Sequence, residues 1–274
     1  MKKYNFISGL PRSGSTLLSS ILNQNPRFTA GISDPLHQYT KSIIQNSDNA
    51  VGIGTLVNND KRKNIIRGIF DSFYRNDAEV CFNTNRSWCS ETSLLKEIYP
   101  DFKMIAMVRD VRWVLNSFEV LHQKNPFTIK PLYLNNDFSS VYERTHSLMG
   151  NMNGGQGAFV AGPLNSLKQA MFSTEIDQIC FVEFTALVKN PESTMRKIYN
   201  FLNEKYYDHD FNNVETSYDE YDREARFKDL HTIRRKVEYK KQNRLIPDDL
   251  WMQFDNVNFW KNIDTSKMNW IKNN

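Results

Sequence analysis

The segment from Gly9 to Thr16, Gly-Leu-Pro-Arg-Ser-Gly-Ser-Thr, constrains the fold of this 274-residue chain more than any other feature. It follows a short apolar, β-like run from Tyr4 to Ser8 and precedes residues 15–22, where leucine and isoleucine recur at helical spacing. Two glycines with four residues between them, set between a strand and a helix, are typical of a loop whose backbone N–H groups surround an anion. The sequence therefore predicts a phosphate-binding loop.

Strands and helices are predicted to alternate beyond this loop. Three further β-like runs occur, and a segment with helical spacing or a helix start signal follows each of them. The predicted strands are 79–82, 103–108 and 179–184, and the predicted helices are 94–98, 111–122 and the segment from Pro191 to Leu202. Because helices that alternate with strands cover the faces of a parallel sheet, the order predicts an α/β fold, a P-loop-type parallel sheet flanked by helices.

We expect a single domain over residues 1–274, since the length suits one large domain and no internal repeat occurs. Its helical insertions lie over the core, its glycine-rich loop is flexible and near the site, and its C-terminal part closes over the site. The predicted parts are a core at 4–204, helical insertions at 35–47 and 61–75, one or two helices within 137–175 interrupted by the loop at 150–160, and a C-terminal cap at 205–274.

Composition excludes several other classes of protein. Hydrophobic residues make up 40% and charged residues 24%, which is ordinary globular usage and argues against a disordered or fibrous chain. The net charge of +4 is too small and too dispersed to coat a polyanion, so we expect no nucleic-acid partner. The brief apolar run near the start ends at Pro11, well short of the roughly 20 residues of a membrane helix, so no membrane partner is expected.

The three cysteines, Cys81, Cys89 and Cys180, cannot all pair with one another and show no metal-ligand spacing. We therefore expect neither a disulfide framework nor a metal site, and we expect a cytoplasmic protein. No oligomeric state is predicted.

The phosphate-binding loop departs from that of nucleoside triphosphatases, which place Lys where this chain has Ser15 and do not carry a cation at the position of Arg12. The run Pro-Arg-Ser-Gly-Ser-Thr-Leu-Leu resembles the 5′-phosphosulfate loop of sulfotransferases that use 3′-phosphoadenosine-5′-phosphosulfate (PAPS), in the branch similar to tyrosylprotein sulfotransferases and related bacterial enzymes. The resemblance implies that Arg12 stabilises charge on the bridging oxygen and the leaving 5′-phosphate. The rest of the implied cradle is Ser13, Gly14, Ser15, Thr16 and Leu17.

A second segment, Met104 to Ser117, resembles the part of these enzymes that holds the 3′-phosphate. It places Arg109 at the end of a predicted strand and Ser117 two turns into the next helix. The resemblance implies that both residues bind the 3′-phosphate, for which the planar guanidinium fork of Arg is suited. A local salt bridge to Asp110 or Glu119 is the alternative role for Arg109.

The general base is the point at which the chain departs from the tyrosylprotein branch. The Glu that serves as base there falls at Ser33 in this sequence, and Ser33 cannot do that work. Asp34 is the preferred candidate, with His37 as the second, because a carboxylate or a neutral imidazole accepts a proton near neutral pH. The alternatives are a helix cap at Ser33 or Asp34 before Pro35, and a packed or surface histidine at His37.

Two further regions bear on the site. Arg86, in the turn after the second predicted strand, is a candidate replacement for a Lys that faces the transferring group in related enzymes, or else a surface residue. Phe184 stands where related enzymes have a Tyr that contacts the 3′-phosphate, so a basic run in the C-terminal part is a candidate to compensate or is a solvated helix face. That run contains Arg234, Arg235, Lys236, Lys240, Lys241 and Arg244.

The sequence thus predicts a PAPS-dependent sulfotransferase without a metal, acting on a hydroxyl or an amine of a small molecule, glycan or peptide. Two other functions stay open at this point. One is a P-loop kinase-like phosphotransferase, which the absence of the loop Lys disfavours. The other is a non-catalytic nucleotide-binding protein, which the missing Glu allows.

Overall fold

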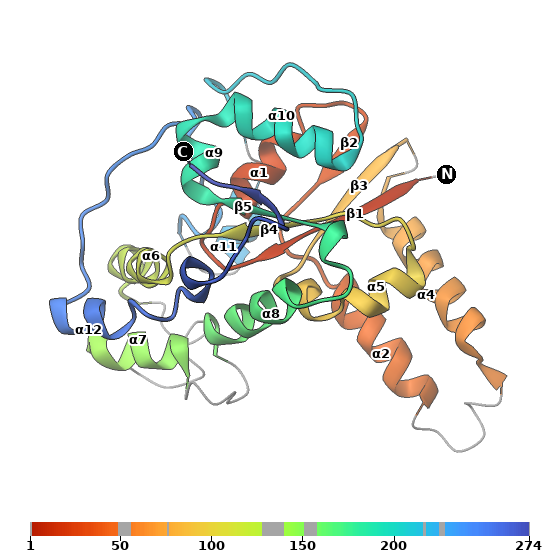
Figure 1. Cartoon of the computed structure of the whole chain (residues 1–274), viewed down its shortest axis with the longest axis horizontal. Helices are drawn as coiled ribbons and strands as arrows, with labels where there is room; N and C mark the ends of the chain where they lie inside the picture. Colours follow the sequence, from red (N-terminus) through yellow and green to blue (C-terminus); the bar gives the residue numbers. More distant parts are fainter. Residues whose placement is uncertain are drawn as a thin grey trace.

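The computed structural model describes residues 2–48, 56–75, 77–127, 140–150, 158–215, 218–224 and 228–273 (Figure 1). Within these residues six strands form one sheet in the order β2-β3-β1-β4-β5-β6, and every strand pair is parallel. The strands are β1 Lys3–Gly9, β2 Phe28–Ala30, β3 Val80–Thr84, β4 Met104–Val108, β5 Ile179–Glu183 and β6 Asn269–Ile271. The predicted parallel α/β sheet is therefore confirmed.

Helices cover both faces of the sheet, which makes three layers (Figure 1). One face carries α1 Ser15–Leu22, α9 Phe184–Lys189 and α10 Pro191–Leu202. The other carries α2 Leu36–Asp48, α4 Asn59–Phe73, α5 Thr92–Ile98, α6 Val111–Lys124, α7 Val141–Met149 and α8 Ala161–Met171. Shorter elements are α11 Asp219–Glu224, α12 Asp248–Gln253 and the 3₁₀ turns η1 Arg86–Ser90, η2 Ile176–Gln178 and η3 Phe259–Asn262.

The central strand β4 shows why a continuous apolar run forms the middle of this sheet. All five of its side chains are buried, and alternate residues enter opposite layers. Met104, Ala106 and Val108 join the core under α6 and α8, whereas Ile105 and Met107 join the core under α1 and α10. A strand with helices on both faces has no solvent side, so its sequence needs no polar alternation.

The two shortest strands were not predicted, because three residues give too little pattern to recognise. β2 follows the loop after α1, and β6 comes from the segment that we expected to act only as a cap. Trp270 of β6 stacks on Phe181 with ring centroids 5.1 Å apart, which anchors this edge strand. The C-terminal segment therefore extends the sheet as well as crossing over it.

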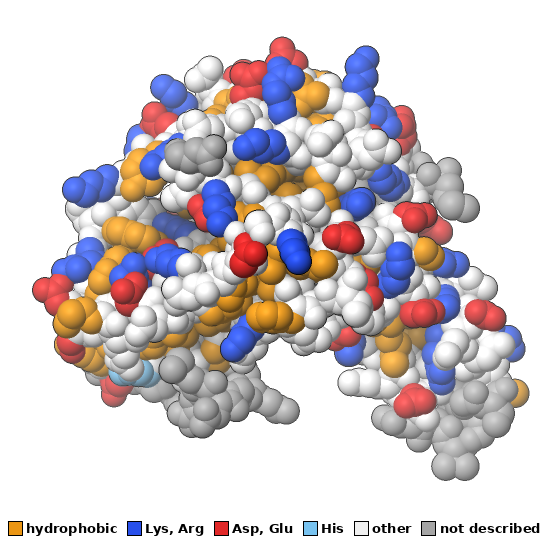
Figure 2. All heavy atoms as spheres, viewed as in Figure 1, with side chains coloured by type: hydrophobic (Ala, Val, Ile, Leu, Met, Phe, Trp, Pro, Cys, Tyr) orange, Lys and Arg blue, Asp and Glu red, His pale blue; other side chains and the backbone are white. Residues whose placement is uncertain are grey.

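The predicted insertions are the helices α2 and α4, which pack against each other and project from the sheet at the lower right of Figure 1. Figure 2 shows this face of the molecule hollowed beside them, with basic and acidic side chains mixed over its surface. Residues 151–157 of the predicted glycine-rich loop lie outside the described residues. No helix among the described residues has the length and apolar character that crossing a membrane requires.

Gly9 and Gly14 have positive φ angles, 101° and 95°, and both are close to neighbouring atoms. A Cβ on Gly9 would lie 2.2 Å from the carbonyl oxygen of Met107, because β1 and β4 meet there. A Cβ on Gly14 would lie 2.8 Å from the ring of Phe184. Only glycine therefore fits at either end of the loop.

We expect Gly9→Ala to lower the free energy of unfolding by at least about 2 kcal/mol, because the substitution adds backbone strain and an overlap with a strand. Gly68→Ala is the matched control, since a Cβ on Gly68 in α4 meets no atom within 4 Å. It should gain about 0.5–1 kcal/mol from helix propensity. Urea denaturation measures both, and equal stability of the two variants would contradict this account of the loop.

Candidate active site

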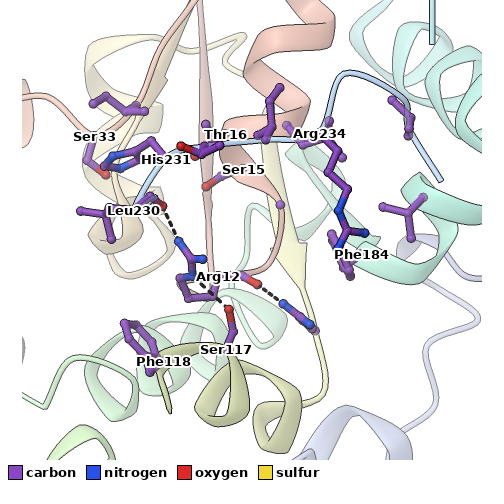
Figure 3. A pocket seen from close by; sticks show the side chains of 18 of the residues that line it. Arg12, Ser15, Thr16, Ser33, Ser117, Phe118, Phe184, Leu230, His231 and Arg234 are labelled. Carbon is purple, nitrogen blue, oxygen red and sulfur yellow. Dashed lines mark hydrogen bonds between the residues drawn. The ribbon is translucent and has the colours of Figure 1, made fainter. Parts of the chain in front are cut away.

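A cavity of about 620 Å³ opens beyond the carboxyl ends of β1 and β4 (Figure 3). The chain passes to one side of β1 through β2 and β3 and then to the other side through β4 and β5, so the cavity lies where the strand order reverses. Parallel sheets bind ligands at such a point. Its walls come from the loop after β1, from η1, from the middle of α6, from α9, and from residues 230–242 of the C-terminal segment, which we call the flap.

Three arginines from three different elements line this cavity: Arg12 of the loop, Arg86 of η1 and Arg109 after β4. In the described part of the chain none of them forms an ion pair with a carboxylate. Burial, and then the charge of Arg12, lower the pKa of Arg86 and of Arg109 to about 10. Burial likewise lowers the pKa of Arg12, and the nearby charges of Asp222 and Asp229 oppose that shift. Partly buried cations that converge without a direct ion pair make a site for a multiply charged anion.

Arg12 connects three parts of the structure. Its φ of 55° is in the left-handed region, which holds its side chain toward the cavity. Its Nε donates a hydrogen bond to Ser117 Oγ of α6 at 3.1 Å, and its Nη1 donates to the carbonyl oxygen of Leu230 in the flap. The sequence could not indicate the second contact, because a backbone carbonyl leaves no side-chain signal.

Arg109 is fixed on three sides, and the predicted local salt bridges are not what fixes it. Its Nη1 donates to the carbonyl oxygen of Arg12 at 2.7 Å, and its Nη2 donates to Gln242 Oε1 at 3.1 Å. The guanidinium also lies over the ring of Phe184, 4.6 Å from its centroid. Asp110 instead pairs with Arg112 and Lys261, and Glu119 pairs with Arg144. Gln242 and the supporting role of Phe184 were not predicted.

The remaining predicted cofactor residues divide into two groups. Gly14, Ser15, Thr16 and Leu17 line the cavity at the N-terminal end of α1, together with Ser117 of α6. Ser13 is fully buried, and its hydroxyl donates to the carbonyl oxygen of Leu10. Its side chain therefore stabilises the loop and does not line the cavity.

The basic run of the flap only partly reaches the cavity. Arg234 and Lys236 line it, and Lys240 lines a smaller cavity of about 180 Å³ on the other side of Arg109. Arg235 pairs with Glu215 at 3.5 Å, and Arg244 pairs with Asp248 of α12. Arg234 and Lys236 of this run therefore remain candidates to compensate for Phe184.

The structure does not bring Asp34 and His37 to the cavity, which corrects their selection as candidate bases. Asp34 caps α2, since one carboxylate oxygen accepts from the N–H of Leu36 at 2.9 Å and the other accepts from Asn83 Nδ2 at 2.6 Å. His37 packs edge-on against Trp88, 4.7 Å between centroids, beside Glu91. The alternative roles of helix cap and packed histidine describe both residues. Ser33, in contrast, lines the cavity.

A parallel sheet with a lysine-free phosphate loop and three converging arginines defines a protein built to bind a multiply phosphorylated or sulfated anion. The sulfotransferase family matches residues 6–208, and the chain belongs to that family. This membership decides against the kinase-like alternative. The match ends before the flap begins.

The chain is similar to a curated relative and to several solved structures. Protein-tyrosine sulfotransferase A of Caenorhabditis elegans is 27% identical over 206 residues, which are 72% of this chain and 49% of that protein, so the chain spans about half the length of this relative. The crystal structure of a sulfotransferase from Alicyclobacillus acidocaldarius superposes with a TM-score of 0.50 at 15% identity, covering 77% of this chain and 84% of the other. At that identity the second likeness shows a shared fold.

We expect Arg86→Met to raise the free energy of unfolding of the ligand-free protein by about 1–3 kcal/mol, because it removes a buried cation that faces other cations. Arg196→Met is the control, since Arg196 and Glu192 form an exposed ion pair of 2.7 Å, and its effect should stay within about 0.5 kcal/mol. Urea denaturation without added anions measures both. An Arg86→Met protein that is less stable than the wild type would contradict the view that no neighbouring group compensates the charge of Arg86.

Proposed function

We propose that this chain transfers the sulfuryl group of PAPS to a hydroxyl, or to an amine, of an acceptor molecule. The observation that carries the proposal is the convergence of Arg12, Arg86 and Arg109 on one cavity beside a phosphate-binding loop. The family membership supports the same activity. We further propose a cytoplasmic setting, which the burial of all three unpaired cysteines supports, and a small-molecule, glycan or peptide acceptor.

The described residues fit a donor with two separated anionic groups. The amides and hydroxyls at residues 13–17, at the start of α1, would hold the 5′-phosphosulfate. Arg109 and Ser117 would hold the 3′-phosphate, with Arg234 and Lys236 of the flap closing over it. The donor supplies the activated sulfuryl group. The protein supplies positive charge and holds the reacting groups in position.

Arg12 would neutralise the charge that develops on the leaving 5′-phosphate, since it lies between the loop and α6. Arg86 lines the cavity together with Phe159, over whose ring its guanidinium lies at 5.3 Å from the centroid. We place the transferring group between these two arginines. Because arginines provide this charge, transfer should need no metal ion.

Nucleotide binding tests the proposal directly. At one hundred times its Kd, 3′-phosphoadenosine-5′-phosphate (PAP) should stabilise the protein by about 2.7 kcal/mol, which raises Tm by about 5–10 °C. This shift and the transfer of ³⁵S from labelled PAPS should both survive EDTA. Stabilisation by ATP with magnesium but not by PAP, or activity that EDTA abolishes and a metal restores, would contradict the proposal.

Substitutions of Arg109 and of Arg12 should affect different quantities, nucleotide affinity in the first case and turnover in the second. Arg109→Ala should reduce the preference for PAP over adenosine 5′-phosphate by about 10- to 100-fold, because its partner charge is present in the ground state. Arg12→Ala should keep this preference and lower kcat by about 10²–10³-fold, because its partner charge develops in the transition state. Calorimetric titration with both nucleotides and steady-state rates measure the two effects. An Arg109→Ala protein with unchanged preference would overturn the assignment of the 3′-phosphate site.

A further inference from the structure

A histidine and an aspartate at the cavity form a pair that the family match, ending at residue 208, does not cover. The Nδ1 atom of His231 in the flap lies 2.6 Å from Asp222 Oδ1 of α11, and the backbone N–H of His231 donates to Asp222 Oδ2 at 2.8 Å. Both side chains are mostly buried, with 14% and 7% of their surface exposed. One carboxylate therefore fixes both the backbone and the ring of His231.

The pair lies close to residues 31–33, the segment that follows β2. Tyr218, directly before α11, has its hydroxyl 3.7 Å from where a Cβ on Gly31 would be and hydrogen bonds with the backbone of Ile32. The next residue, Ser33, lines the cavity together with His231. Figure 3 shows these two side chains on one side of the cavity and Phe184 on the other. His231 therefore lies beside Thr16, at the proposed 5′-phosphosulfate end of the cavity, and opposite Phe184 (Figure 3).

The hydrogen bond to Asp222 fixes the tautomer of the neutral His231 ring. An ionised carboxylate only accepts hydrogen bonds, so in the neutral ring Nδ1 carries the proton and Nε2 keeps its lone pair. In the described part of the chain no residue hydrogen bonds to Nε2. Burial lowers the pKa of His231 below its ordinary 6.5, Arg12 and Arg86 lower it further, and Asp222 opposes them. Among the described residues, Tyr218 and Tyr221 also pack against the ring, with centroids 6.2 and 5.1 Å from it.

We propose that His231 is the general base of this sulfotransferase and that Asp222 is its positioning residue. The acceptor oxygen forms a bond to sulfur while its proton passes to Nε2 of His231. The bond between sulfur and the bridging oxygen breaks, and its electron pair stays on the phosphate of PAP. The proton then leaves His231 to solvent. This inference rests on the proposed function.

Turnover rates and PAP affinities of three variants test the role of His231 as the general base. We use ³⁵S-labelled PAPS with water, a phenol, a primary alcohol and a tyrosine peptide as acceptors. His231→Gln should lower turnover by about 10²–10⁴-fold and Asp222→Asn by about tenfold or more, with PAP affinity changed by less than about threefold. His146→Gln, on the exposed face of α7, is the control and should match the wild type. The acidic limb of the kcat profile should disappear in His231→Gln.

A spectroscopic measurement checks the same assignment without turnover. Nitrogen-15 spectra of the histidine-labelled protein at pH 7.5 should contain the signal of a neutral ring protonated on Nδ1 that disappears in His231→Gln and changes in Asp222→Asn. His209 should give a second such signal that neither substitution removes, because its Nδ1 faces Gln24 Oε1 at 3.3 Å. A ring protonated on Nε2 would overturn the proposal.

The outcomes also separate this inference from the function on which it rests. Full turnover in His231→Gln while the wild type is active would contradict only the role of His231. A wild-type protein that binds PAP but transfers to none of the acceptors would contradict the catalytic function as well.

Discussion

The hydrogen bond from Arg109 to the carbonyl oxygen of Arg12 is the contact on which the site depends. It joins the loop after β1 to the end of β4, and the close approach of Gly9 to Met107 directly beneath it leaves no freedom between the two strands. Once these strands are fixed, the two arginines point into one cavity at a set separation. These two strands would therefore set the distance between the two anionic groups of the donor that we propose.

Placing these cations together lowers the stability of the folded protein. Arg12, Arg86 and Arg109 are removed from water without a carboxylate partner in the described residues, so the core on both sides of the sheet offsets their desolvation. A bound anion reverses this cost. Under the proposed function, relief of this repulsion would add to the binding free energy of a polyanionic nucleotide and not to that of neutral adenosine compounds.

Sequence reasoning found the parts of the site that depend on local pattern. The loop, Arg12 and Arg109 each stand at the end of a strand, where spacing and residue type indicate a phosphate site. The sequence did not indicate contacts made by the backbone, such as the one from Arg12 to the carbonyl of Leu230. It also did not indicate contacts from residues far along the chain, such as the one between Arg109 and Gln242. Proximity in sequence favoured Asp34 as the base, but a carboxylate directly before Pro35 is also an ideal helix cap, and that local use prevails.

The flap has a consequence for how the protein is made. Synthesis proceeds from the N-terminus, so β1 to β5 and the three arginines leave the ribosome before residues 230–242. During that interval the arginines have no flap over them and stay open to water. Arrival of the flap then encloses the arginines and brings His231 to them in the same step. Strand β6 leaves the ribosome after the flap, so the edge of the sheet is completed last.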